Sequence, residues 1–269
     1  MIKIQTTTKI AETSSKGNQE KWLNNNRWYK LDNFGYEALS ETIISSLIDQ
    51  TNINNLGFSH ASYKMEKLEV HNHQRTGCSS ENFLKPNQSL ITLAKLFRQC
   101  IGPDWQAKAN KKNNLESRIK WIIEQTKELT NLESFDEYLT LLFELDMLFC
   151  NEDRHLNNIA VIQENDTFNY CPFFDFGAGL LSNVRDYPLD VLPSTLLKQI
   201  KANPLNTTFT RQVHAIEKLT RPKLETYFTE EKIMQVLEPA LEYYPKLYIP
   251  YIKDRVLTTI KTRSKKLFS

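Results

Sequence analysis

The chain has 269 residues, a formal net charge of +2 and only seven glycines. This length is enough to bury a full core and to form either one bilobal unit or two small domains. The near-neutral charge argues against direct binding to nucleic acid or to a membrane surface, and no run of eighteen apolar residues is present that could span a bilayer.

The N-terminal part of the chain is predicted to form strand, loop, strand and helix. Residues 1–10 alternate loosely between apolar and polar types, and a polar turn covers 13–21. Three asparagines at 24–26 mark a turn before a short aromatic strand over 27–31. Over 36–49 the apolar residues recur every three or four positions, which predicts an amphipathic helix.

The middle of the chain is predicted to be mainly helical. The segment 76–84 contains a glycine and two serines and is expected to connect two lobes. Helical periodicity then covers three stretches, 89–100, 115–129 and 135–149. Ser134 and Glu137 have the spacing of a capping box, which predicts the start of the last of these helices.

The remaining chain is predicted to form a hairpin and then helices. Residues 159–170 read as two strands around a polar turn. After an irregular stretch, two or three helices are expected, over about 208–219, 229–243 and 246–267. A β-rich front and a helical rear predict two lobes with a cleft between them. We place an N-terminal nucleotide-binding lobe at 1–85 and a C-terminal helical lobe at 86–269.

The motif with the clearest chemical meaning lies just past the middle of the chain. Residues 153–158 read Asp-Arg-His-Leu-Asn-Asn, and Asp175-Phe-Gly begins 22 residues after that first aspartate. The residue types and the Asp-x-x-x-x-Asn spacing match the kinase catalytic loop and its metal-binding Asp-Phe-Gly. Asp153 is expected to accept a hydroxyl proton, and Asn158 and Asp175 to hold the magnesium ions that bridge the ATP phosphates. The sequence therefore predicts an α+β, bilobal protein-kinase-like fold.

Each of these residues also fits a purely structural role when it is taken alone. Asp153, Asn158 and Asp175 could all be turn residues that bond to their own backbone. Their common register favours the functional interpretation. We include His155 among the catalytic-loop residues, where it is expected to hold the loop rather than to bind a ligand. Arg154 is a candidate for balancing the nearby charge.

A second candidate group lies on the aromatic strand and the helix that follows it. Lys30 belongs to the predicted strand, and the next helix carries Glu37 and Glu41 one turn apart. A strand lysine that contacts the α- and β-phosphates and is fixed by a helix glutamate is the usual kinase arrangement. This order favours a functional Lys30 over a solvated strand lysine. Both glutamates are candidates for its partner, with Glu41, deeper in the helix, preferred.

The polar turn near the N-terminus is a candidate phosphate-covering loop. It contains neither Gly-x-Gly-x-x-Gly nor a Walker A motif, but backbone amides near Gly17, together with Lys21, could cover phosphates. Residues 14–21 read Ser-Ser-Lys-Gly-Asn-Gln-Glu-Lys and resemble the Ser-x-x-Gly-x-Gln-x-Lys phosphate loop of HipA-like serine/threonine kinases. Residues 151–158 are similar to the Asn-x-Asp-x-His-x-x-Asn catalytic loop of that family, and Asp175 takes the place of its metal-binding aspartate. The chain looks closer to the compact CtkA- and HipT-type members.

This resemblance implies an ATP- and Mg²⁺-dependent bacterial kinase that transfers the γ-phosphate to a serine or threonine hydroxyl of a protein. It adds Ser14, Gly17, Gln19 and Lys21 to Lys30 and Glu41 as nucleotide-binding residues. Ser14 matches a serine that such kinases autophosphorylate. A small DNA-binding antitoxin is the partner that the family suggests, with no direct nucleic-acid contact by this chain.

Two other interpretations of the motifs stay open. Asp-Arg-His and Asp-Phe-Gly are also the forms found in phosphatidylinositol 3/4-kinases, which leaves a lipid kinase as an alternative acceptor class. The small size of the chain and the lack of an obvious basic segment facing a membrane favour a protein substrate. A nucleotide-binding pseudokinase scaffold is the third interpretation, and the intact acidic and amide positions argue against it.

The cysteines and the N-terminus bear on location. Four cysteines lie far apart without a Cys-x-x-Cys pair, which favours reduced thiols over disulfides or a zinc site. The first residues lack the apolar core of a signal peptide. We therefore expect a cytoplasmic bacterial protein, with non-classical secretion or translocation as an effector left open.

Overall fold

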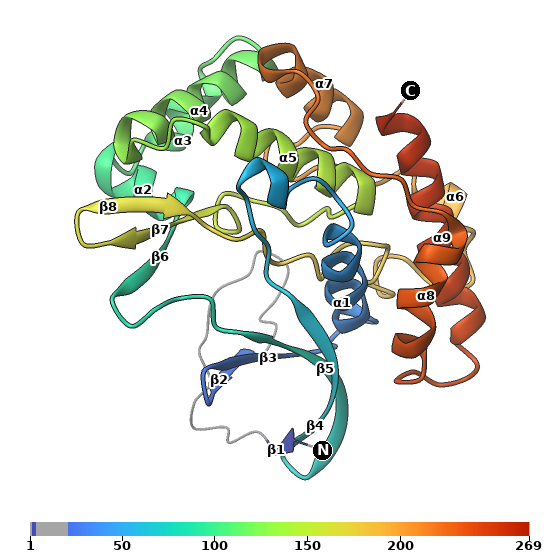
Figure 1. Ribbon diagram of the computed structural model, residues 1–269. Helices are drawn as coiled ribbons and strands as arrows, with labels where there is room; N and C mark the ends of the chain where they lie inside the picture. The colour runs from blue at the N-terminus through green and yellow to red at the C-terminus, as the bar shows by residue number, and fades with distance from the viewer. Residues whose placement is uncertain (1, 4–20, 269) are drawn as a thin grey trace.

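The computed structural model describes residues 2–3 and 21–268. The strands of the first half gather at the end of the molecule that holds the N-terminus, and long helices make up the opposite end (Figure 1). The β-rich front and the helical rear that the sequence predicts are both present. Expectations for residues 4–20 lie outside the described part of the chain.

The first half is organised by a five-stranded sheet in the order β1-β4-β5-β3-β2. Its strands are β1 (Ile2–Lys3), β2 (Lys21–Asn24), β3 (Arg27–Leu31), β4 (Tyr63–Val70) and β5 (His73–Glu81). Strand β1 runs parallel to β4, and the other described pairs are antiparallel. Helix α1 (Glu37–Ile48) packs against β4 and β5, as its apolar periodicity predicts.

The β2–β3 hairpin turns through Asn25 and Asn26, both with positive φ (50° and 59°). Asparagine tolerates this left-handed conformation better than most residues, and two such residues form the tight turn that suits twisted strands. The hairpin register places Lys21 directly opposite Lys30. The predicted strand over 27–31 is confirmed, and its pairing brings two lysines to one position across the sheet.

The β4–β5 hairpin is not predicted by the sequence. Strand β4 carries four charged residues between 64 and 69, so its apolar alternation is weak. Its turn consists of His71 and Asn72, which adopt positive φ (50° and 62°) without a glycine to mark them. The segment 76–84, predicted as a connection between lobes, is instead strand as far as Glu81.

The second half combines a small sheet with helices. Strands β6 (Gln88–Thr92), β7 (Ala160–Glu164) and β8 (Thr167–Tyr170) form an antiparallel three-stranded sheet in that order. The helices are α2 (Leu93–Cys100), α3 (Trp105–Asn110), α4 (Leu115–Thr130), α5 (Phe135–Phe149), α6 (Pro193–Leu196), α7 (Phe209–Thr220), α8 (Glu230–Leu241) and α9 (Ile249–Leu267). The predicted 159–170 hairpin and the three C-terminal helices are confirmed within a few residues.

The helix predicted over 89–100 is correct only from Leu93 onward. Its first residues belong to β6 and pair with β7. Thr92 marks the change, because its hydroxyl accepts the backbone N–H of Lys95 at 3.2 Å and caps α2. Periodicity alone does not separate a short strand from a helix that continues its apolar spacing.

Helix α5 lies across the core of the helical half and leads directly into the 153–158 loop. Its predicted limits are confirmed, but the capping box at its start does not form, since Ser134 makes no capping hydrogen bond with its side chain. The backbone N–H of Ser134 instead donates to the Tyr170 hydroxyl at 2.8 Å. Glu137 pairs with Lys223 at 2.6 Å, so the long-range ion pair replaces the local cap.

The predicted lobe boundary at residue 85 falls in the link between the two sheets, which runs from Asn82 to Asn87. The division of the chain into lobes at this point stays a prediction. All four cysteines carry free thiols. Among the described residues, no helix has the length and apolar character needed to cross a membrane.

Candidate functional site

Lys30 and Glu41 form a buried ion pair between β3 and α1. The Lys30 ammonium donates to Glu41 Oε1 at 2.5 Å and to Asp175 Oδ1 at 2.8 Å. Lys30 is 6% exposed and Glu41 is fully buried. Of the two glutamates that the sequence left open, Glu41 is therefore the one that pairs with the strand lysine.

Glu37 has a different task at the start of the same helix. Its carboxylate accepts the backbone N–H of Phe34 at 2.8 Å and that of Gly35 at 3.1 Å. These bonds satisfy donors at the entry of α1 and suit the helix dipole. Burial raises the pKa of Glu37. Glu37 thus holds the turn that leads into α1, and the glutamate one turn later faces the lysine.

Helix α1 also holds the backbone next to Asp175. The second carboxylate oxygen of Glu41 accepts the N–H of Phe176 at 2.9 Å, and the Ser40 hydroxyl donates to the Phe176 carbonyl at 2.8 Å. Asp175 itself has φ of 64°, a left-handed conformation that aspartate tolerates and that is common at functional positions. The strained backbone presents the Asp175 carboxylate to Lys30.

Two lysines neutralise the Asp175 carboxylate. Lys21 lies opposite Lys30 in the β2–β3 register, and its ammonium is 3.9 Å from Asp175 Oδ1. Like charges opposite each other in a sheet destabilise it unless an anion lies between them. Burial raises the pKa of Asp175, but Lys21 and Lys30 outweigh burial and hold it below its usual range. Burial lowers the pKa of Lys30, and Asp175 and Glu41 outweigh it, so this pKa lies well above its usual value.

The 153–158 loop is organised around a buried arginine. Arg154 is 1% exposed, and its Nε and Nη2 donate to Asp146 oxygens of α5 at 3.0 and 3.1 Å. Its Nη1 donates to the carbonyls of Asn158 at 3.0 Å and Phe174 at 2.7 Å. The guanidinium therefore ties the loop to the residue preceding Asp175. The expected charge-balancing role understates this structural one, because Arg154 also holds the two main-chain carbonyls in place.

The same loop brings the other motif residues together. The Asn158 amide nitrogen donates to the carbonyl of Asp153 at 3.1 Å, which fixes the orientation of the amide group. The Asn151 amide donates to Asp146 Oδ1 at 2.8 Å and to the Asp175 carbonyl at 3.3 Å. Asp153 and Asn158 thus lie in one tight turn. The Asn151 amide connects the start of this loop to Asp175 by its bond to the Asp175 carbonyl.

The donor types available here fit a magnesium ion that is bound together with a nucleotide. Mg²⁺ usually takes one or two carboxylates and completes its shell with phosphate oxygens and water. Asp175 supplies a carboxylate and Asn158 an amide oxygen. Among residues 2–3 and 21–268, no three His, Cys, Asp or Glu side chains form a metal-binding cluster. A metal here would therefore rely on phosphate oxygens from its substrate.

His155 is held within the loop, as the sequence suggests. Its Nδ1 accepts the backbone N–H of Asn157 at 3.2 Å. Three other expected nucleotide-binding residues, Ser14, Gly17 and Gln19, lie outside the described residues. Lys21 is thus the member of the predicted phosphate loop whose position is described.

Neither Gly177 nor Gly179 has positive φ, so neither is required for a left-handed backbone. Gly179 is needed because α1 lies very close. A Cβ at this position would lie 2.7 Å from Ile44 Cδ1 and 3.1 Å from Ser40 Oγ. The glycine allows the chain that follows Asp175 to pack on the helix that carries Glu41.

The chain then leaves the site through Leu180 and Leu181, which are buried and have positive φ (54° and 60°). This conformation is costly for a bulky residue. The Tyr36 hydroxyl donates to the Leu180 carbonyl at 2.8 Å, and Arg255 of α9 donates to the Leu181 carbonyl at 3.0 Å. Hydrogen bonds from Tyr36, at the start of α1, and from Arg255 of α9 hold the two leucines in this conformation.

Comparison with solved structures identifies the fold. The proinflammatory kinase CtkA of Helicobacter pylori matches 96% of this chain and 90% of its own, with a TM-score of 0.63 and 16% sequence identity. The chain has the fold of CtkA. The predicted kinase-like, α+β fold is confirmed by this match. HipA of Shewanella oneidensis, solved with HipB and operator DNA, matches 96% of this chain and 68% of its own at a TM-score of 0.48 and 12% identity. Neither a protein-family model nor a curated protein sequence matches the chain.

Proposed function

We propose that the protein is an ATP- and Mg²⁺-dependent serine/threonine protein kinase of the HipA-like type. The observation that carries this proposal is the buried cluster of Lys30, Glu41 and Asp175, set beside the 153–158 loop. The CtkA-like fold and the motif resemblance agree with it. A lysine, a helix glutamate and a metal-binding aspartate in contact are the parts that an active kinase assembles around ATP.

In this proposal each residue acts on a defined part of the reaction. Asp153 orients the acceptor hydroxyl and takes its proton, while Lys30 contacts the nucleotide phosphates and is fixed by Glu41. Asn158 and Asp175 would hold magnesium, which neutralises charge on the β- and γ-phosphates when it is bound. Because Asp175 stays ionised at neutral pH, it can serve as a ligand without first losing a proton.

The N-terminal loop completes the proposed nucleotide site. We assign Ser14, Gly17, Gln19 and Lys21 to phosphate binding on the basis of the motif resemblance. The position of the Lys21 ammonium beside Asp175 supports this assignment for that residue. Ser14 is the proposed site of autophosphorylation. A protein hydroxyl as acceptor and a small antitoxin partner remain predictions from the same resemblance, and a cytoplasmic location remains a prediction from the cysteine spacing and the first residues of the sequence.

The test is mass spectrometry of the purified protein after incubation with Mg²⁺ and ATP. We expect phosphate in the 14–21 loop and a loss of about 10²- to 10⁴-fold in its rate of incorporation for Asp153→Asn and Asp175→Asn. Asparagine suits position 175 because it tolerates the left-handed backbone there. Asp166→Asn, an exposed change in the β7–β8 turn, is the matched control and should keep the wild-type rate.

Two further measurements separate the alternatives. Label that enters phosphoinositide vesicles but not protein would identify a lipid kinase. ATP binding by calorimetry without any phosphate transfer would identify a pseudokinase. Folded wild-type protein that neither binds nor consumes ATP would overturn the proposal.

A further inference from the structure

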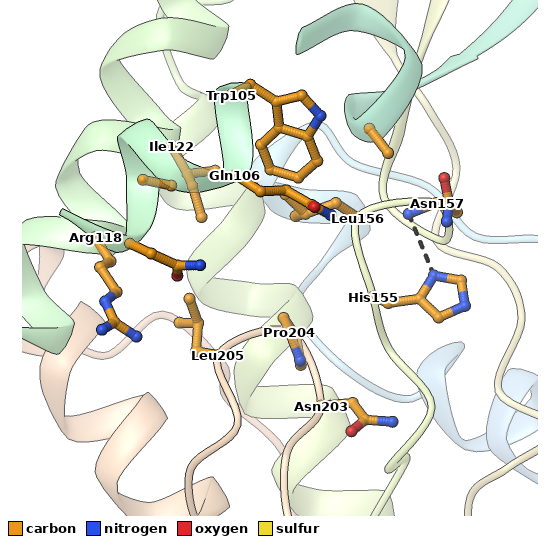
Figure 2. Close-up of a pocket in the computed structure, with 13 residues that line it drawn as sticks. Trp105, Gln106, Arg118, Ile122, His155, Leu156, Asn157, Asn203, Pro204 and Leu205 are labelled. Carbon is orange, nitrogen blue, oxygen red and sulfur yellow. Dashed lines mark hydrogen bonds between the residues drawn. The ribbon is translucent and has the colours of Figure 1, made fainter. Parts of the chain in front are cut away.

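A pocket of about 380 Å³ opens beside the candidate catalytic loop. Figure 2 shows Trp105, Gln106 and Arg118 on one side of it, and His155 and Asn157 on the other. The first side is built by α3 and α4, and the second by the 153–158 loop. The loop at 203–205 closes the lower side in this view. None of the contacts among Lys30, Glu41 and Asp175 involves these residues.

The pocket is within reach of a peptide whose hydroxyl lies at Asp153. His155 follows Asp153 by two residues, so their Cα atoms are at most about 7 Å apart. An extended peptide advances about 3.3 Å per residue. A side chain two or three residues from a phosphorylated serine or threonine would therefore reach the pocket wall.

The lining has donors that lack acceptors. Arg118 Nε is buried without a hydrogen-bond partner, and the Arg118 guanidinium forms no ion pair among the residues that the structure describes. His155 Nε2 is likewise buried and unpartnered. Because Nδ1 of this ring accepts the Asn157 N–H, a neutral His155 carries its proton on Nε2 and is a donor there. Both atoms are closed off from the open pocket, so an acidic group there would instead meet the outer guanidinium nitrogens of Arg118, a lining residue without an ion-pair partner among the described residues.

The charge around the pocket is positive. None of its lining residues is aspartate or glutamate. Lys111 and Lys112 follow the lining residue Asn110 and are exposed, with no ion pair among the described residues. Glu116, an acid close to Arg118 in sequence, is paired with Lys218 at 2.6 Å. A carboxylate matches this environment, because it offers two acceptor oxygens to a guanidinium.

We propose that this pocket is an acceptor subsite that binds an acidic side chain of the protein substrate, within about three residues of the phosphorylated serine or threonine. The inference rests on the proposed kinase function and adds a substrate class to it. The substrate would carry a glutamate, an aspartate or a phosphorylated residue close to the acceptor hydroxyl. Arg118 would bind this group, and Gln106 and Asn157 would add polar contacts.

The test uses peptides with one acceptor serine. Each position from three before to three after this serine is replaced, one at a time, by glutamate, glutamine or phosphoserine. Initial rates of phosphate transfer are measured for the wild type, Arg118→Gln and Lys120→Gln. Lys120 is exposed on the same helix and pairs with Glu124, so it matches the loss of charge without lining the pocket. For the wild type and for Lys120→Gln, we expect kcat/KM to be about tenfold higher with glutamate than with glutamine at one position of the peptide. The difference should lie in KM rather than in kcat. In Arg118→Gln the ratio of the two kcat/KM values should fall to about one.

The outcomes separate the subsite from the proposed kinase function. A larger preference for phosphoserine that is also lost in Arg118→Gln supports the subsite and identifies phosphate as its anion. A wild type without an acidic preference, or a preference that survives in Arg118→Gln, overturns the subsite. If the wild type phosphorylates neither itself nor any peptide, the proposed function fails. Calorimetric binding of the glutamate and glutamine peptides to the wild type and Arg118→Gln then decides on the subsite alone.

Discussion

At the scale of single residues, the two glutamates of α1 show how position sets the role of one side-chain type. Glu41 is fully buried between Lys30 and the Phe176 N–H, whereas Glu37 binds backbone donors at the helix entry. Both are glutamates one turn apart, so composition gives no reason to separate them. The sequence prefers Glu41 because it lies deeper in the helix, and the contact with Lys30 agrees with this preference, since Glu37 binds backbone donors that precede α1.

Replacing each glutamate by glutamine should have different effects. Glu41→Gln keeps a side-chain oxygen for the Phe176 N–H but removes the charge that holds Lys30, so we expect the rate of phosphate transfer to fall by at least about tenfold. Glu37→Gln weakens the bonds to the Phe34 and Gly35 N–H groups and removes a charge from the first turn of α1, so it should cost about 1 kcal/mol of unfolding free energy with a small change in rate. Urea unfolding and autophosphorylation rates measure both quantities. Equal losses of rate in the two variants would contradict this division.

At the scale of elements, the packing of α1 on the segment after Asp175 depends on a missing side chain. Ile44 Cδ1 and Ser40 Oγ occupy the space where a Cβ of residue 179 would lie. This contact joins the helix that carries Glu41 to the segment that carries Asp175. A sequence pattern shows the glycine but not the helix that it faces, because the two are more than a hundred residues apart.

Gly179→Ala should push α1 away from this segment. We expect a loss of about 1–3 kcal/mol of stability and a lower rate of phosphate transfer. Ile44→Val removes the Cδ1 atom 2.7 Å from the new methyl group and should restore part of both losses. Thermal unfolding and rate measurements on the two single variants and the double variant test the coupling. Additive effects in the double variant would show that the two residues do not compete for this space.

At the scale of the whole molecule, the sequence predicts the order of β-rich and helical halves and most of the helices. Periodicity is informative for these elements because apolar residues recur at helical spacing in each of them, even in α5, which is buried on almost all sides. It misses β4 and β5, whose strands are charged or small and polar, and it merges β6 with α2. The motif residues are likewise visible in sequence, but Arg154 as the centre of the loop is not. Its partners, Asp146 and the carbonyls of Asn158 and Phe174, come together only through the fold.

Asp32 joins the sheet, α1 and the C-terminal helices. Its carboxylate accepts the Ala38 N–H at 2.6 Å and the hydroxyl of Tyr244, which follows α8, at 2.7 Å. Burial, reinforced by Glu37, raises the pKa of Asp32 to about 8. An unfolded aspartate has a pKa of about 3.9, so between these values the folded state binds more protons than the unfolded state. The contribution of Asp32 to stability therefore falls as pH rises from about 4 to about 8.

Asp32→Asn removes this titration while keeping an acceptor for Ala38 and a polar group for Tyr244. We expect the free energy of unfolding of the wild type to fall relative to Asp32→Asn as pH rises, by up to about 1.4 kcal/mol per pH unit within the window. Urea unfolding at pH 5, 6, 7 and 8 measures the difference. Burial of Glu144, which does not act on Asp32, adds a similar slope to both proteins, which the comparison cancels. Parallel curves for the two proteins would show that Asp32 is ionised throughout.

The two leucines that follow Gly179 connect the last helix of the chain to the candidate site. Each left-handed leucine costs of order 1–3 kcal/mol and stays in place because neighbouring groups hold its carbonyl. One of those groups, Arg255, belongs to the last helix. A fragment that stops before α9 would still contain every reactive group discussed above. In such a fragment the Leu181 carbonyl would lose its hydrogen bond from Arg255, and Leu181 would relax toward an extended backbone. The segment that follows Asp175 would then be held less firmly.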